Sequence, residues 1–295
     1  MANFSDPTLL YQQDVDIVAE RIIKETIGSN ATFPIDLFSI IDAWDIEVKL
    51  INDVNIDFQA RIELGVAPCI TINSEFSLED IKSNNLPLIK NNNLRFSLAH
   101  ELGHLFLNIN SAKLRERMLI NNTKRNADMY TKITEFQADN FASALLMPKY
   151  AMTDYLNYGN NPKSCAETIS NHFGCSLTSA FLRLARINEN IVACLQVDKK
   201  TRTIKHLTYS KSWKDIGHEY YPYKELFICK QTILPKLSAT NSVLKNSESS
   251  AKNIKNKMNL TNWFENYDGD YCISEWPYLF EHNIITFLEV EYPDF

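Results

Sequence analysis

The sequence lacks several features that would assign it to a specialised class of protein. No run of 18 or more apolar residues occurs, so no membrane-spanning helix is expected. Residues Met1 to Leu10 lack a basic segment followed by an apolar one, so we expect no secretory signal there. Internal repeats and marked low-complexity tracts are also missing. We therefore expect a soluble, cytoplasmic protein with no membrane partner.

The six cysteines show no spacing typical of a metal site or a redox motif. None forms a C-x-x-C pair, and none lies at a ligand-like spacing from a histidine. Reduced thiols in an intracellular protein fit this pattern best. A basic excess is missing too, because 30 Lys and Arg face 36 Asp and Glu for a formal net charge of -6. General nucleic-acid binders usually carry such an excess, so bulk phosphate binding is disfavoured.

The chain does contain enough apolar sequence for a sizeable core, because 45% of its 295 residues are hydrophobic. Apolar side chains at helical spacing predict helices over Asp14–Ile27 and Pro34–Trp44, with Pro34 near the first turn of the second helix. Three strands are expected to follow, Glu47–Ile51, Phe58–Leu64 and Pro68–Asn73, and the second of them shows period-two alternation. The amino-terminal part therefore predicts helices packed with a small sheet.

Two longer helices are predicted in the middle of the chain, over Leu94–Leu107 and Thr131–Leu146. Pro148 ends the second helix, because a residue that precedes proline is pushed out of helical geometry. We expect Asn84–Asn93, with its three consecutive asparagines, to form a polar loop or cap. Asn108–Lys124 is expected to form a short helix or an irregular insertion.

The second half of the chain changes character after a helical stretch over Lys163–Arg186 that Gly174 breaks. Beyond that stretch we expect a mobile loop over Ser238–Asn259. Four strands are also expected, of which the first two form a hairpin: Ile191–Val197, Arg202–Tyr209, Phe227–Leu234 and Ile284–Glu291. The carboxy-terminal part is therefore predicted to be rich in β-structure.

His100, Glu101 and His104 form an H-E-x-x-H motif within the first of the two long helices. Residues four apart project from one helical face, so both imidazoles can reach a single metal ion. Zinc accepts neutral histidine nitrogens, and a catalytic zinc site keeps one position for a water whose pKa falls to about 7. Glu101 lies one step around the helix, beside that water, and is the candidate general base.

Two histidines on an ordinary helix would give the same motif by chance. The apolar flanks Leu98, Ala99, Leu102, Leu105 and Phe106 predict that this helix is buried. Burial of three polar side chains without partners is costly, and a metal ion supplies the partner. Zinc is therefore the better interpretation.

A third ligand is expected from the second long helix, where Glu135 and Asp139 lie four apart on one face. Glu135 is the better direct ligand, and Asp139 then accepts the free ring N–H of a ligand histidine. Two alternatives stay open, which are Asp139 on the metal in place of Glu135, and an exposed acidic stripe without function. Ala138 and Ala142 lie near the same face and would let the two helices approach closely.

The two helices together resemble a known family. Arg95–Leu107, which reads RFSLAHELGHLFL, is similar to the signature of the ImmA/IrrE family of metallo-endopeptidases. Glu135–Pro148, which ends in FASALLMP, is similar to the second signature of that family. The resemblance covers about Pro34–Pro148 and continues more faintly beyond it. The stretch between the two motifs is longer than is usual in the family. This difference affects the geometry expected for the loop and not the identity of the expected ligands.

The resemblance implies a zincin-like peptidase domain in residues 1–150, with helices on a small twisted sheet and a zinc cleft between them. It also implies a protein substrate, typically a helix-turn-helix transcriptional repressor of a mobile element or a stress regulon. Residues 151–189 are then a helical segment, and 190–295 a β-rich, sensor-like module. The fold class expected for the whole chain is α+β.

Two other features of the sequence bear on function. The turn at Gly174–Ser176 between two short helices resembles a helix-turn-helix. Near the second helix only Arg183 and Arg186 are basic, and two basic residues are few for contacts to DNA phosphates. Plain helical packing is therefore preferred, and direct DNA binding is not expected. Tyr130 lies shortly before the Glu135 helix and is a candidate to reach the oxyanion.

Two functions fit these residues. The first is a zinc endopeptidase that holds its substrate extended along an edge strand of the Phe58–Asn73 region. The second is a non-proteolytic regulator with a structural zinc site, whose carboxy-terminal module binds a repressor, a ligand or DNA. Glu101 favours the enzyme, because a structural site needs no general base. A toxin–antitoxin or phage-related accessory role is a third, weaker hypothesis.

Overall fold

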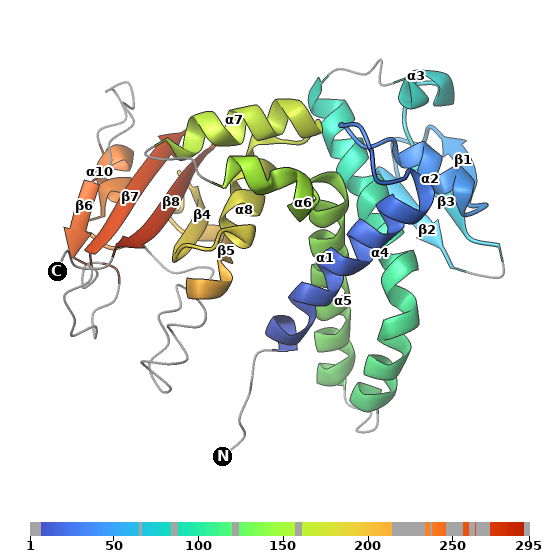
Figure 1. Cartoon of the computed structure of the whole chain (residues 1–295), viewed down its shortest axis with the longest axis horizontal. Coiled ribbons are helices and arrows are strands. Elements are labelled where there is room, and N and C mark those ends of the chain that lie inside the picture. The colour runs from blue at the N-terminus through green and yellow to red at the C-terminus, as the bar shows by residue number, and fades with distance from the viewer. Residues whose placement is uncertain are drawn as a thin grey trace. The chain divides into compact units, whose positions relative to one another are not determined.

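The computed structural model divides the chain into two compact units (Figure 1). One unit contains Met1–Met152 and Asn171–Ser176, and the other contains Thr153–Ser170 and Leu177–Phe295. The structure describes residues 7–64, 67–83, 88–119, 124–156, 161–213, 234–236, 238–245, 256–259, 263 and 272–291. Helices come first and a β-rich carboxy-terminal module follows, with one sheet in each unit, so the predicted α+β class is confirmed. Within these residues no helix has the length and apolar character to cross a membrane.

The first unit contains a three-stranded sheet in the order β1-β3-β2. The strands are β1 (Glu47–Ile51), β2 (Ala60–Glu63) and β3 (Cys69–Asn73), which confirms the three strands predicted from the sequence. Strand β1 runs parallel to β3, whereas β2 pairs with β3 in the antiparallel sense. Among the described strands β2 has a partner on one side only, so it is an edge strand.

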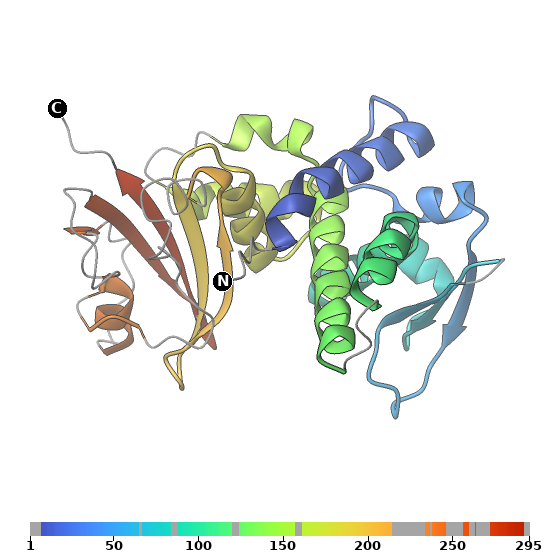
Figure 2. The ribbon, with the colours of Figure 1, turned by 90° about the horizontal axis from the view of Figure 1, so that it is seen from below.

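Five helices accompany this sheet in the first unit: α1 (Pro7–Thr26), α2 (Leu37–Ala43), α3 (Leu78–Lys82), α4 (Leu88–Leu119) and α5 (Lys124–Leu146). The long helices α4 and α5 pack side by side, α1 packs against α5, and α4 packs against β2 (Figures 1 and 2). A short helix, α6 (Lys149–Met152), follows. The apolar faces of α1, α2, α4 and α5 form one core with the inner face of the sheet. Helix α4 is therefore held between the sheet and α5.

Three predicted boundaries in this unit are wrong. The expected polar loop at Asn84–Asn93 ends earlier, since Asn91–Asn93 already lie in α4. Asparagine costs a helix less than about 1 kcal/mol per residue, and burial of Leu94 and Leu98 outweighs that cost. Asn108–Lys124, expected to form a short helix or an irregular insertion, is mostly a continuation of α4, which ends at Leu119, and α5 begins at Lys124.

Helix α2 begins later than Pro34 predicts. Asp36 is its N-cap, and a carboxylate oxygen of Asp36 accepts a hydrogen bond from the Phe38 N–H at 3.0 Å. Such a cap satisfies one of the free N–H groups of the first turn, so the helix starts at Leu37. The Phe33–Pro34 peptide bond that precedes it is cis.

Small residues allow α4 and α5 to approach closely. A Cβ atom added to Gly103 would lie 3.0 Å from the Ala138 Cα and 3.2 Å from the Phe141 Cβ. Ala138 and Ala142 on α5 are both buried. The predicted close helix approach is therefore seen directly at Ala138, with Gly103 as the residue on the facing helix.

The second unit contains a five-stranded antiparallel sheet in the order β5-β4-β8-β7-β6 (Figure 2). Its strands are β4 (Val192–Asp198), β5 (Ile204–Tyr209), β6 (Asn256–Asn259), β7 (Cys272–Leu279) and β8 (Asn283–Glu291). Its helical elements are η1 (Thr153–Tyr155), α7 (Pro162–Phe173), whose last three residues belong to the first unit, α8 (Leu177–Ile187) and α10 (Ala239–Lys245). The predicted β4–β5 hairpin and the break between α7 and α8 are confirmed.

Two predictions for this unit are wrong, and one lies largely outside the described residues. The segment Ser238–Asn259 contains α10 and β6 and is not simply a loop. Strand β7 was not predicted, because Glu275 and Pro277 interrupt its apolar pattern. Of the strand predicted at Phe227–Leu234, only the last residue lies in the described part of the chain.

Helix α8 is a core helix of its unit and not an exposed recognition helix. It packs against β4, β5 and β8, and the Phe181 ring contacts the Tyr278 ring. Arg183, one of the two basic residues considered for phosphate contacts, is only 1% exposed. Plain helical packing therefore describes this helix.

A buried carboxylate joins α10 to the five-stranded sheet. Glu275 on β7 accepts hydrogen bonds from the Ala239 N–H, the Thr240 N–H and hydroxyl, and the Trp263 indole N–H. The Thr240 hydroxyl also contacts that of Thr286 on β8. Burial raises the pKa of Glu275, and these hydrogen bonds oppose the rise without cancelling it.

We expect substitution of Gly103 to push α4 and α5 apart in proportion to side-chain size. In Gly103→Ala, the gain of about 1 kcal/mol in helix propensity offsets much of an overpacking cost of about 1–3 kcal/mol. Gly103→Val lacks most of that gain, so it should lower the free energy of unfolding by about 2–3 kcal/mol. Urea unfolding followed by circular dichroism measures both. Equal midpoints for wild type and Gly103→Val would contradict the close helix contact.

Glu275→Ala should lower the stability of the second unit by about 3 kcal/mol, because buried N–H donors lose their acceptor. Since the folded protein raises the pKa of Glu275 above 4.5, its contribution is largest below that pH and falls as the pH rises through the folded-state pKa. The difference from wild type should therefore shrink as the pH rises above 4.5 through the folded-state pKa.

Tryptophan fluorescence reports unfolding of this unit, which holds three of the four tryptophans: Trp213, Trp263 and Trp276. Thr286→Val is the matched control, since it removes one hydroxyl contact and leaves the carboxylate in place. Two results would contradict this role of Glu275. One is a loss of stability in Thr286→Val as large as that in Glu275→Ala, and the other is a stability difference between wild type and Glu275→Ala that grows with pH.

Candidate metal centre

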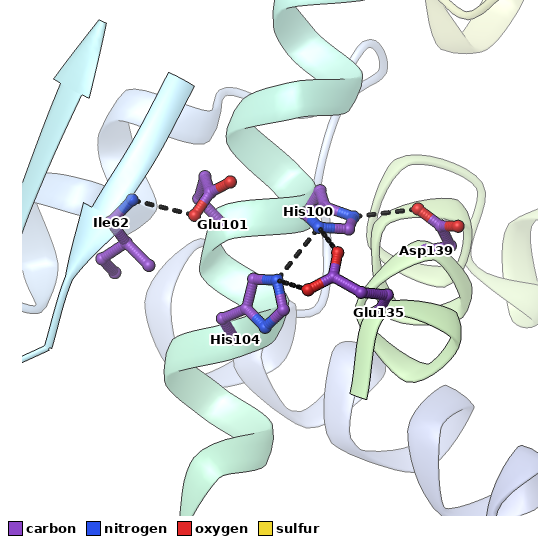
Figure 3. A network of polar contacts seen from close by, with 6 residues as sticks. All are labelled: Ile62, His100, Glu101, His104, Glu135 and Asp139. Carbon is purple, nitrogen blue, oxygen red and sulfur yellow. Dashed lines mark hydrogen bonds and ion pairs between the residues drawn. The ribbon is translucent and has the colours of Figure 1, made fainter. Parts of the chain in front are cut away.

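Three side chains from α4 and α5 converge on one point (Figure 3). His100 and His104 lie one helical turn apart on α4, and their Nε2 atoms are 3.0 Å apart. Glu135 on α5 places Oε2 3.3 Å from His100 Nε2 and Oε1 3.5 Å from His104 Nε2. The sequence predicts these three residues as ligands, and the structure brings all three together.

The cluster has the dimensions and chemistry of a zinc site. Two atoms bound to one tetrahedral zinc at about 2.0–2.1 Å lie about 3.3 Å apart. The three separations in the cluster, 3.0, 3.3 and 3.5 Å, lie close to that value. Two imidazole nitrogens and one carboxylate are also a ligand set that catalytic zinc uses. The residues present therefore fit a zinc ion with a fourth position left open.

Asp139 lies on the opposite side of the His100 ring. Its Oδ1 is 2.9 Å from His100 Nδ1, the ring nitrogen that faces away from Glu135 and His104 (Figure 3). A hydrogen bond donated by Nδ1–H to Asp139 selects the tautomer in which Nε2 carries the lone pair. The arrangement therefore suits Asp139 as a residue that orients a ligand and not as a ligand itself.

The charges around His100 compete with its burial. Burial lowers the pKa of His100, but the hydrogen bond and charge of Asp139, with the charges of Glu101 and Glu135, outweigh it and raise the pKa above the ordinary value. The same acidic groups would favour a divalent cation in this position. The cluster is thus an electrostatic site for a cation even before the ligand geometry is considered.

Glu101 points away from this cluster and toward the sheet (Figure 3). Its Oε2 accepts a hydrogen bond of 2.8 Å from the Ile62 N–H on β2. The Gln59 carbonyl accepts a hydrogen bond from the Asn73 N–H on β3, so the main-chain groups of Gln59 face β3. Along a strand the main-chain N–H and C=O groups of successive residues point alternately to its two sides. Those of Arg61 therefore also face β3, and those of Ile62 face the free edge of β2. The candidate base is therefore held by the edge strand that borders the site.

A pocket of about 400 Å³ contains the cluster and the neighbouring edge of β2. Its lining comes from β2 and its end, from α4 and from α5: Arg61, Ile62, Leu64, His100, Glu101, Gly103, His104, Leu107, Thr134, Glu135 and Gln137. The side chain of Glu135 is 53% exposed, whereas that of His100 is 16% exposed. The candidate ligands thus lie on the wall of this pocket, and Glu135 is more exposed than His100.

Sequence reasoning missed two contributions to this pocket. The Ile62 N–H is a backbone group, and nothing in the identity of the residue marks it as the partner of Glu101. Arg61 and Leu64 belong to a strand whose alternation was noted, but their place beside α4 depends on packing. The side chain of Tyr130, the candidate for the oxyanion, lies outside the described part of the structure.

Comparisons with known proteins agree with this geometry. Residues 91–185 match the family model described as the IrrE N-terminal-like domain, Peptidase_M78. A solved structure named Mycobacterium tuberculosis transcriptional regulator is similar, with a TM-score of 0.55, 12% identity, and coverage of 97% of this chain and 92% of that chain. At this identity the likeness concerns the fold alone. The search of curated proteins found no match. The match over residues 91–185 confirms the predicted resemblance to the ImmA/IrrE family within that segment.

Proposed function

We propose that this chain is a zinc-dependent endopeptidase that hydrolyses a peptide bond in an intracellular regulatory protein. The convergence of His100, His104 and Glu135, with Glu101 beside them in one open pocket, carries the proposal. A structural zinc site has no need of an extra carboxylate next to an open coordination position. The family resemblance suggests a helix-turn-helix transcriptional repressor as the substrate and a stress response as the setting.

Each residue of the centre has a separate role in this proposal. His100, His104 and Glu135 hold the zinc ion, and Asp139 orients His100 through the hydrogen bond to Nδ1. When bound, zinc acts as a Lewis acid that polarises the scissile carbonyl and stabilises the oxyanion. Glu101 accepts the proton of the attacking water and returns it to the leaving amine.

Strand β2 offers a surface for an extended substrate. Main-chain groups of Ala60 and Ile62 face the free edge, and the Ile62 N–H orients the Glu101 carboxylate. An added strand would pair with the groups of this edge that Glu101 does not use. Its backbone would then run along the pocket that contains the candidate ligands.

The remaining parts of the chain complete the proposal. We assign the peptidase domain to residues 1–150, a helical segment to 151–189, and a β-rich, sensor-like module to 190–295. The alternative is a non-proteolytic regulator with a structural zinc site, acting through a repressor, a ligand or DNA. The name of the similar solved structure, a transcriptional regulator, favours that alternative.

Metal content separates the roles of the two acids on α5. We expect about one zinc per chain in the wild type, and loss of that zinc in Glu135→Ala because a ligand is missing. Asp139→Ala should keep zinc but bind it about 10- to 100-fold more weakly, because only the orientation of His100 is disturbed. Mass spectrometry of protein purified without chelator, followed by competition with a chelator, measures both quantities.

Glu167→Ala, a change to an exposed acid of α7, is the control for the loss of one negative charge. Its zinc content and affinity should equal those of the wild type. A wild type that binds no zinc when zinc is supplied would refute the metal centre. A larger loss of zinc in Asp139→Ala than in Glu135→Ala would instead assign Asp139 as the ligand and Glu135 as the residue that orients His100.

Glu101→Gln tests catalysis without removing a ligand. We expect zinc content to stay at the wild-type level and peptide hydrolysis to fall by about 10²- to 10⁴-fold, which is the usual contribution of a general acid–base group. Product analysis by mass spectrometry on a candidate repressor or a peptide library measures the rate. Full retention of function in this variant would favour the non-proteolytic regulator.

A further inference from the structure

Arg61 is a cation placed at the rim of an otherwise acidic site. It lies on β2, its side chain is exposed, and it lines the same pocket as His100 and Glu135. Among the described residues that line this pocket, it is the one with a lysine or arginine side chain. The residues with ionisable acidic side chains in the lining of this pocket are Glu101 and Glu135. A substrate carboxylate would therefore be repelled by this pocket unless a cation receives it.

No ion pair of Arg61 is present among the residues that the structure describes. Lys49, by contrast, lies on the same sheet and pairs with Glu47 at 3.7 Å. An arginine without an internal partner presents a planar fork of donors that matches a carboxylate in bidentate geometry. The guanidinium of Arg61 is thus available to an incoming group.

The register of β2 places Arg61 well for a side-chain contact with a strand added at the free edge. Arg61 pairs with Thr71 on β3, so its own N–H and C=O face β3 and not the free edge. For an antiparallel strand added at the free edge, the residue opposite Arg61 occupies a position without main-chain hydrogen bonds. In such pairs the Cα atoms are only about 4.5 Å apart and the side chains are closest.

We propose that Arg61 recognises a carboxylate of the substrate, carried by the residue that lies opposite it when the substrate binds along β2. The inference rests on the proposed peptidase function of the pocket, and it adds the chemistry of the substrate next to the cleaved bond. The carboxylate has two possible sources, an Asp or Glu side chain within the chain or the terminal carboxylate of the substrate. The second source would restrict cleavage to bonds near a carboxy terminus.

The test uses zinc-loaded full-length protein and mixed-sequence peptides that are acetylated and amidated at their ends. One position is fixed as Glu, Gln or Lys, and it is moved along the peptide. We expect one position at which Glu is cleaved about tenfold faster than Gln, measured as kcat/KM, and Lys is cleaved most slowly. A second set with free carboxylate ends tests the terminal source. Faster cleavage of that set alone assigns the contact to the terminus.

Two variants connect this preference to the side chain. Arg61→Gln should remove the preference for Glu over Gln, and Arg61→Glu should reverse it in favour of Lys. Lys49→Gln is the matched control, because it removes one positive charge from the same sheet outside the pocket. The control should keep the wild-type preference. A preference for Glu that survives in Arg61→Gln, or that disappears equally in Lys49→Gln, overturns the proposal.

A binding measurement separates this proposal from the peptidase function. Fluorescein-labelled Glu and Gln peptides are titrated into Glu101→Gln protein and into the double variant with Arg61→Gln, and anisotropy gives each Kd. A wild type that cleaves nothing, with Glu peptides bound about tenfold more tightly through Arg61, would refute the peptidase and keep the recognition site. Cleavage and binding that are equal for Glu, Gln and free-terminus peptides would refute the recognition site and keep the peptidase.

Discussion

The close contact between α4 and α5 sets the geometry on which the candidate centre depends. Spacing along α4 alone brings His100 and His104 together, but Glu135 reaches them only if the second helix lies at the right distance. At the crossing, Gly103 has no Cβ and faces Ala138, so the two backbones can approach. Helix packing and metal binding both favour the same separation of α4 and α5. The free energies of the two processes are therefore linked.

Three acidic side chains near the centre are distinguished by their partners and not by their chemistry. Glu135 faces the Nε2 atoms of both histidines, Asp139 faces the Nδ1 atom of one, and Glu101 faces a main-chain N–H of the sheet. A carboxylate can bind a metal, orient an imidazole or move a proton, and the surrounding donors decide which role it suits. Glu275 in the second unit shows a fourth use, in which a carboxylate anchors a short helix to a buried strand.

Local spacing explains why so much of the candidate site could be predicted from the sequence. Residues four apart on a helix share a face wherever that helix packs, so the placement of His100 with His104, and of Glu135 with Asp139, follows from the chain alone. The bond from the Ile62 N–H to Glu101 depends on the register of a strand against a helix 39 residues away, which no local pattern records. Strand β7 was missed for a related reason, because its polar residue Glu275 finds partners that are distant in sequence.

The hydrogen bond from the Ile62 N–H to Glu101 also reduces the number of unpaired N–H groups at the free edge of β2. An unpaired sheet edge invites the same edge of another molecule, and edge strands that bind peptides carry this hazard permanently. Strand β2 has only four residues, two of them charged, and one of its outward N–H groups already has an acceptor within the chain. The remaining edge is too short and too polar to support an extended sheet between copies. Strand β2 is therefore a poor template for pairing with the same strand of another copy.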